Sequence, residues 1–332
     1  MRKTIFSTIL FLIFIILILI SYLTFFGHET NKFNKIIKSE IHKSNSDIIL
    51  NFEKILIKLD PIKLNLFIKF INPNLNYLKT ELPLSLLKTN VNLEFLTKNK
   101  IIINDITLST EYLDFDKIKP LIKKANIYNE NFKLIKSGKL KVKNFNLKFD
   151  DNFNVKNDYE LKGDLNSVNI KFSEEYEINN LISTFSYRRG SLSFENMSWN
   201  LINEKKEKNE FFNGKISILS KKNIQDININ FEIKNLRDLL KISVMNYDLS
   251  QDSTQKVVAN LSINKKKQIE FSNLSVSDKN NKFDIKNVIL DQNLNVVNFD
   301  QISVKTSIDN KLNNEFTIQN KKKILIKGKV FD

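Results

Sequence analysis

The chain has no cysteine and only two histidines, His28 and His42, among its 332 residues. Without cysteine there is no thiol nucleophile, no disulfide and no thiolate ligand for a zinc cluster. His28 stands just after an N-terminal apolar segment and His42 lies close behind it, so neither is placed to complete a catalytic site in the rest of the chain. We therefore predict that the protein is not an enzyme and uses no metal or other cofactor.

Arginine is also scarce, because only four of the 52 basic residues are arginine and the net charge of +15 comes almost entirely from lysine. Planar, bidentate phosphate recognition favours arginine, whereas lysines spread along a chain mainly keep it solvated. No arginine cluster or RNA-binding motif is present, so we expect no nucleic-acid partner. A lysine-rich surface that binds another anionic polymer is an alternative, and it would lose affinity steeply with salt.

Glycine and proline are few, with six and four residues respectively, so two-residue glycine hairpins cannot be the general way in which this chain turns. Asparagine and aspartate tolerate left-handed backbone and can take that role. Polar runs rich in these residues recur at 150–152, 156–158, 221–223 and 278–281. We expect turns there.

One long apolar run is present, from Ile5 to Phe26. At about 1.5 Å per residue it forms a helix of roughly 33 Å, enough to cross a hydrocarbon core of about 30 Å. No small-residue cleavage site follows it, which favours an uncleaved signal anchor over a signal peptide. We predict a cytoplasmic tail at residues 1–4 and export of residues 27–332. Representative anchor residues are Ile5, Phe14, Leu19 and Phe26.

Residues 27–47 are predicted to form a juxtamembrane linker that contains a short amphipathic helix at 30–44. Its apolar stripe consists of Phe33, Ile36, Ile37 and Ile41, and lysines occupy much of the remainder. Such a helix can lie at the membrane surface, with its lysines on anionic head groups. It can equally cap the edge of the sheet that follows.

Residues 48–332 alternate between apolar and polar side chains, the pattern of β-strands with one apolar face. The clearest predicted strands lie at 139–143, 145–149, 168–172, 227–233, 269–271, 273–276, 283–286 and 302–305. Their close spacing indicates neighbouring antiparallel strands, and segments opening with Gly138, Gly163 and Gly214 hint at a loose repeat. Two short helices are expected, at 116–125 and 235–242. The predicted fold class is mainly β, with an N-terminal transmembrane helix.

In this arrangement the chain resembles the AsmA-like family of bacterial envelope proteins. The stretch Ile-Leu-Ile-Lys-Leu-Asp-Pro at 55–61, followed by the segments at 65–69 and 82–84, is similar in style to the N-terminal region of that family, and so is the segment at 156–163. The resemblance implies an elongated antiparallel sheet, curled into an open groove at 48–332, whose apolar concave face carries phospholipid acyl chains. It also implies anchoring in the bacterial inner membrane, a periplasmic domain and a role in envelope maintenance.

The groove would then be lined by the apolar residues of the alternating strands, and its partners would be phospholipid or another acyl-chain lipid, the inner membrane and other envelope proteins. The candidate lining residues are Leu140, Val142, Phe145, Leu147, Phe149, Val168, Ile170, Phe172, Ile227, Ile229, Phe231, Ile233, Phe271, Phe283, Ile285, Ile302 and Val304. About fifteen strands at roughly 4.8 Å spacing would extend on the order of 70 Å.

The same alternation is also expected of a closed β-sandwich, because a strand pattern does not distinguish a groove from a core. A membrane-tethered β scaffold or interaction module without lipid transport is therefore the alternative function.

Overall fold

The computed structural model describes residues 2–92, 102–124, 133–150, 154–171, 176–203, 208–221, 224–234, 254–264, 268–278, 281–290, 296–308, 311–320 and 324–330. The described chain is mainly β, and its strands form open antiparallel ladders. It divides into two compact units. Unit 1 contains residues 1–128 and 140–163, and unit 2 contains residues 129–139 and 164–332.

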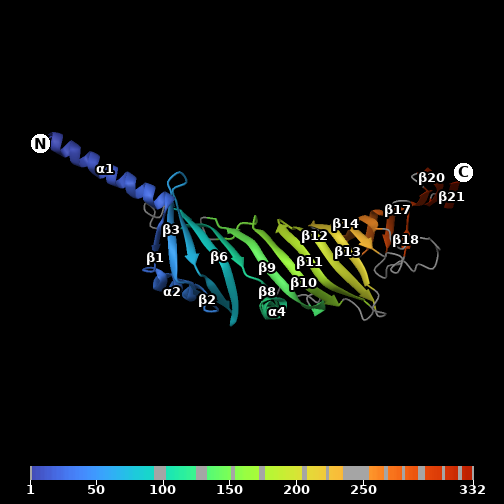
Figure 1. Ribbon diagram of the computed structural model, residues 1–332, viewed down its shortest axis with the longest axis horizontal. Coiled ribbons are helices and arrows are strands. Elements are labelled where there is room, and N and C mark those ends of the chain that lie inside the picture. Colours follow the sequence, from blue (N-terminus) through green and yellow to red (C-terminus); the bar gives the residue numbers. More distant parts are fainter. Residues whose placement is uncertain are drawn as a thin grey trace. The chain divides into compact units, whose positions relative to one another are not determined.

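The N-terminal helix α1 spans Arg2–Phe25 and is drawn in dark blue in Figure 1. Its segment Phe6–Phe25 has a mean hydropathy of 2.8 and no residue buried against the rest of the chain. The sequence-based prediction of a helix long and apolar enough to span a membrane is thus confirmed. The helix ends at Phe25, and Gly27, two residues later, has a φ of +78°, which is accessible to glycine at little steric cost.

Unit 1 contains an antiparallel ladder in the order β1, β3, β4, β6, β7, β9, and a second ladder in which β5 pairs with both β2 and β6. The strands are β1 (His28–Thr30), β2 (Ile48–Asn51), β3 (Lys54–Asp60), β4 (Asn65–Ile71), β5 (Asn74–Tyr77), β6 (Thr80–Asn92), β7 (Ile102–Thr110), β8 (Leu113–Asp114) and β9 (Ile135–Lys148), whose first residues, 135–139, belong to unit 2. Helix α4 (Phe115–Lys124) matches the helix predicted at 116–125 up to its last described residue.

Helix α2 (Asn34–Ser44) begins four residues later than the predicted amphipathic segment. The first residue of that segment, Thr30, belongs instead to β1, where it pairs with Ile55 of β3. Ile37 and Ile41 pack against a buried cluster that includes Phe52 and Phe70. Two residues of the predicted stripe thus cover the core of unit 1, as the capping alternative predicts, whereas the other two, Phe33 and Ile36, are 46% and 61% exposed.

Unit 2 is a meander in which each strand pairs with the next from β11 to β17, and then through β19 and β20 to β21. The strands are β10 (Glu160–Lys171), β11 (Tyr176–Arg188), β12 (Ser191–Asn203), β13 (Lys208–Ser220), β14 (Ile224–Lys234), β15 (Thr254–Asn264), β16 (Ile269–Ser277), β17 (Asn281–Leu290), β18 (Val296–Asn298), β19 (Gln301–Ile308), β20 (Lys311–Asn320) and β21 (Ile324–Val330). Among the described pairings of unit 2, none joins β21 to a strand before β20, so the ladder is open.

Several strand boundaries differ from the sequence-based ones. The predicted pairs of strands at 139–149 and 269–276 are each one continuous strand, β9 and β16. Gly138, Gly163 and Gly214 lie inside strands rather than opening them. The described residues contain twenty-one strands, more than the fifteen expected. The helix predicted at 235–242 falls outside the described residues.

Asparagine in left-handed backbone interrupts the strands of unit 2. Asn180, Asn196 and Asn213 have φ values of 55°, 52° and 51° and lie at register shifts between β11, β12, β13 and β14. Such bulges bend a strand and increase its twist, and asparagine tolerates the required backbone better than most residues. Asparagine therefore has a second role within the strands, besides the turns predicted for it.

Candidate functional site

The apolar residues of unit 2 line up across the strands on one face of the meander. One row consists of directly paired residues on successive strands from β11 to β20, namely Phe185, Phe194, Ile216, Ile229, Ala259, Leu274, Ile285, Ile302 and Ile318. A second row, from β14 to β20, contains Phe231, Val257, Val276, Phe283, Val304 and Phe316. Directly opposed residues point to the same face of a sheet, so these rows form one continuous apolar surface, which we call the apolar face.

The predicted lining residues of β14 to β19 all belong to this face. Ile227 pairs with Leu261, which pairs with Phe271, and this adds a third row. Ile227, Ile229, Phe231, Phe271, Phe283, Ile285 and Ile302 are half-buried, whereas Ile233 and Val304 are buried. Most of the predicted lining residues of β14 to β19 thus keep part of their surface exposed.

The one tryptophan of the protein lies in a cluster of aromatic and aliphatic residues on the apolar face. The rings of Trp199 and Phe211 stack with centroids 4.6 Å apart, and Phe231 meets Trp199 edge-on at 5.7 Å. Phe211, Ile233 and Val257 are buried in this cluster, and Trp199 itself is half-buried. Sequence reasoning did not include Trp199 or Phe211, because the bulges at Asn196 and Asn213 break the alternation that would have revealed them.

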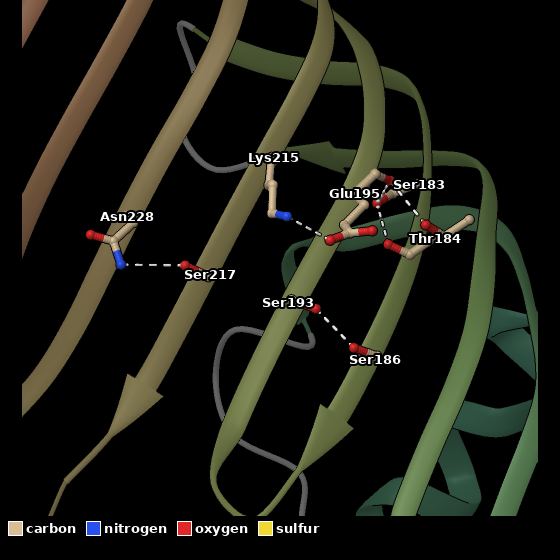
Figure 2. Close-up of polar contacts among 8 residues, drawn as sticks. All are labelled: Ser183, Thr184, Ser186, Ser193, Glu195, Lys215, Ser217 and Asn228. Carbon is tan, nitrogen blue, oxygen red and sulfur yellow. Dashed lines mark hydrogen bonds and ion pairs between the residues drawn. The ribbon is translucent and has the colours of Figure 1, made fainter.

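The opposite face of the same strands is polar, as Figure 2 shows for β11 to β14. Ser186 and Ser193 share a hydrogen bond of 2.8 Å, and the next pair in that row, Ser217 and Asn228, is bonded at 3.4 Å. Lys215 forms an ion pair with Glu195 at 2.7 Å. These side chains bond one another, so unit 2 has one apolar and one polar face.

On the polar face of β17, Asp284 is only 13% exposed and forms an ion pair with Lys282 at 2.9 Å. Burial opposes its charged form, but the hydrogen bonds from Ser275 and Lys282 and the charges of Lys282 and Lys286 outweigh burial, so the pKa of Asp284 lies below its ordinary value.

Because the pKa of Asp284 is lower in the folded chain than in the unfolded chain, its stabilising effect is present above about pH 4 and is lost as the pH falls through the folded value. We expect the Asp284→Asn variant to lose less stability on acidification than the parent chain. Thermal unfolding midpoints measured between pH 7 and pH 3 check this. Equal losses in both chains would contradict it.

In unit 1, the ladder also aligns apolar residues. Ile55, Phe70, Leu87, Leu108 and Phe145 are paired in succession, and a parallel row contains Ile57, Ile68, Thr89, Ile106 and Leu147. This places the predicted residues Phe145 and Leu147 on an apolar face of unit 1. Phe149 is half-buried and forms an isolated bridge with Val155.

The regular pairing of β9 with β7 covers Phe145 to Lys148, and the residues of β9 before Phe145 contact β7 through side chains. The Thr110 hydroxyl accepts the N–H of Val142 at 3.0 Å, and the Ser109 hydroxyl donates to the carbonyl of Lys143 at 2.5 Å. Side chains thus replace the regular ladder beside the predicted residues Leu140 and Val142, both of which are half-buried. A lining role for these two residues stays a prediction.

The remaining predicted residues lie on β10 or beyond it. Val168 is only 1% exposed and packs against Gly138, where a Cβ atom would come within 2.6 Å of the Val168 Cα. Its side chain therefore has almost no surface for a ligand. Ile170 is half-buried. Phe172 falls outside the described residues.

Comparisons of the chain with protein-family models, with curated proteins and with solved structures found no match. The apolar face and the N-terminal apolar helix are therefore the observations on which a function can be argued.

Proposed function

We propose that this protein is an AsmA-like, inner-membrane-anchored protein that binds phospholipid acyl chains on the apolar face of its sheet and handles phospholipid for envelope maintenance. In this proposal α1 is the anchor, the N-terminus is cytoplasmic and residues 27–332 are periplasmic. The observation that carries the proposal is the set of apolar rows that run in register from β11 to β20 with much of their surface half-buried.

Acyl chains fit this face better than a polar ligand does. A soluble protein rarely leaves a long contiguous apolar surface uncovered unless that surface binds something. The rows contain aliphatic and aromatic residues almost throughout, and a hydrocarbon chain needs no directional hydrogen bonds. Within the described residues of unit 2, all strands belong to one antiparallel meander, so no described second sheet covers the rows as a sandwich would.

Trp199 offers a direct test, because it is the only tryptophan and lies on the apolar face. In the full chain solubilised in detergent and mixed with phosphatidylcholine brominated on its acyl chains, we expect strong quenching of tryptophan emission. Bromine quenches only at short range, so the loss reports acyl chains at this face. Phospholipid should also copurify with the full chain and be identified by mass spectrometry.

A matched control moves the tryptophan to the polar face. The double variant Trp199→Phe, Asn228→Trp places the only indole at an exposed position of β14 beside Ser217. We expect little quenching there. Equal quenching at both positions would mean unspecific adsorption, and absence of quenching at Trp199 would exclude acyl-chain binding at this cluster. Either result would contradict the proposal and favour a tethered scaffold.

A further inference from the structure

The turn between β3 and β4 exposes apolar side chains to an unusual degree. Ile62 is 92% exposed and Leu64 is 60% exposed, although the turn joins two fully paired strands. Ile62 therefore contributes almost nothing to the core of unit 1. An isolated exposed apolar residue needs no explanation, but two of them on one four-residue turn form a small apolar tip.

The backbone of this tip is ordered by Asp60. Its Oδ1 accepts the N–H groups of Ile62 at 3.1 Å and of Lys63 at 3.0 Å. Leu64 has a φ of +50°, a left-handed conformation that favours glycine or asparagine over leucine. Local backbone preference thus argues against leucine at this position, and packing does not compensate, since the side chain is mostly exposed. Neither backbone preference nor packing therefore explains why this residue is leucine, and the explanation left is a role for its exposed side chain.

The tip lies on the side of unit 1 where α1 ends. Strand β1 leaves the end of α1 and pairs antiparallel with β3, with His28 opposite Ile57, so β3 runs back toward α1. The Lys58 ammonium group donates to the Phe25 carbonyl in the last residue of α1 at 3.0 Å. From Lys58 the strand continues for only two residues before the turn. At roughly 3.3 Å per residue, Ile62 lies within about 13 Å of the level at which the apolar helix ends.

The end of α1 has the composition of a membrane interface. Tyr22 and Phe26 stack with ring centroids 5.9 Å apart, and Phe25 and Phe26 are both strongly exposed. Tyrosine, which has an apolar ring and a polar hydroxyl, gathers at the level of the lipid head groups. Lys63 lies within the tip, between Ile62 and Leu64, and Lys58 precedes it on β3; lysines at this level attract anionic head groups.

From these contacts we infer that the β3–β4 turn is a second membrane contact, in which Ile62 and Leu64 insert into the interface beside α1. Two contacts would restrain how unit 1 is oriented on the bilayer more than a single anchor does. The inference rests on the proposed role of α1 as the membrane anchor.

The absence of cysteine allows a clean test with single-cysteine variants. Ile62→Cys in the full chain is labelled with an environment-sensitive fluorophore and reconstituted into vesicles of phosphatidylcholine and phosphatidylglycerol. Lys79→Cys is the control. Lys79 is an exposed turn residue with left-handed backbone, and it precedes the start of β6, whereas the tip lies near the end of β6, where Asn92 pairs with Asn65. We expect emission from Ile62→Cys at shorter wavelength and several-fold stronger quenching by brominated lipid than from Lys79→Cys.

Equal quenching at the two positions would overturn the inference, and so would a shift in emission without lipid quenching, which would indicate a protein contact. Alkaline carbonate extraction of the same vesicles tests α1 separately. A chain that resists extraction while its Ile62 probe stays in water overturns only the tip, whereas an extracted chain overturns the anchor and the tip together.

A second variant separates membrane contact from a structural role. Ile62→Asn with Leu64→Asn should keep or raise the thermal unfolding midpoint, because asparagine suits the left-handed position. A clear fall in the midpoint would mean that these side chains stabilise the fold, and would contradict the inference.

Discussion

Replacing Gly138 by alanine is expected to be among the most destabilising single changes in unit 2. Gly138 has a φ of +130°, and an added Cβ atom would approach the Val168 Cα to 2.6 Å and its Cγ2 to 2.8 Å. Backbone strain of this kind costs about 1–3 kcal/mol and overpacking costs a further 1–3 kcal/mol. A combined loss of about 2–6 kcal/mol lowers the thermal midpoint by roughly 4–24 °C, at about 2–4 °C per kcal/mol for a unit of this size. Circular dichroism of the full chain measures this shift.

Gly190 provides the matched control. It also has positive φ, at +78°, but an added Cβ atom there would meet nothing closer than the Ser220 carbonyl at 3.5 Å. Gly190→Ala therefore introduces the strain without the clash, and about 1 kcal/mol is expected. If both alanine variants lowered the midpoint equally, the close approach of β9 to Val168 would not be what requires glycine at 138.

The parts of this fold that could be predicted from sequence are those in which one local rule determines the outcome. The apolar run of α1 and the alternation at Ile227, Ile229 and Phe231 each depend on a single periodicity. The structure confirms both, since α1 is a continuous helix and these three residues face the same side of β14.

The parts that were missed depend on contacts between distant segments. Asparagine is so frequent in this chain that the sequence does not show which asparagines form bulges. Asn196 and Asn213 can be identified as bulges only when the register of their strands with the neighbouring strands is known. Because each bulge shifts the alternation by one residue, Trp199 and Phe211 were left out of the predicted face. Continuous strands such as β16 were divided at the same kind of phase change.

The apolar tip at Ile62 was missed for a different reason. Its sequence, Pro-Ile-Lys-Leu at 61–64, has an apolar residue on each side of Lys63, as an alternating strand would, so the pattern alone does not mark these residues as a turn. Only the hairpin geometry, with Asp60 opposite Asn65, shows that these residues project beyond the paired strands. Apolar residues in turns of predicted hairpins near an anchor therefore merit attention as membrane contacts.

Two lysines in the centre of α1 are expected to abolish membrane integration. Phe14 and Leu17 lie near the middle of the segment Phe6–Phe25, and both are strongly exposed. A lysine at the centre of a spanning helix costs about 3 kcal/mol, so Phe14→Lys with Leu17→Lys costs roughly 6 kcal/mol. The full-length variant should be released from vesicles by alkaline carbonate, whereas the parent chain should stay in the membrane fraction.

The apolar double variant Phe14→Leu, Leu17→Ile is the control and should integrate as the parent does. The thermal midpoint gives an independent check on what α1 is for. None of the segment Phe6–Phe25 is buried against the rest of the chain, so the two lysines should leave the midpoint of the β units unchanged. If the lysine variant lost its cooperative β unfolding as well, α1 would be part of a protein core rather than an anchor, and the membrane side assigned to Ile62 would have no basis.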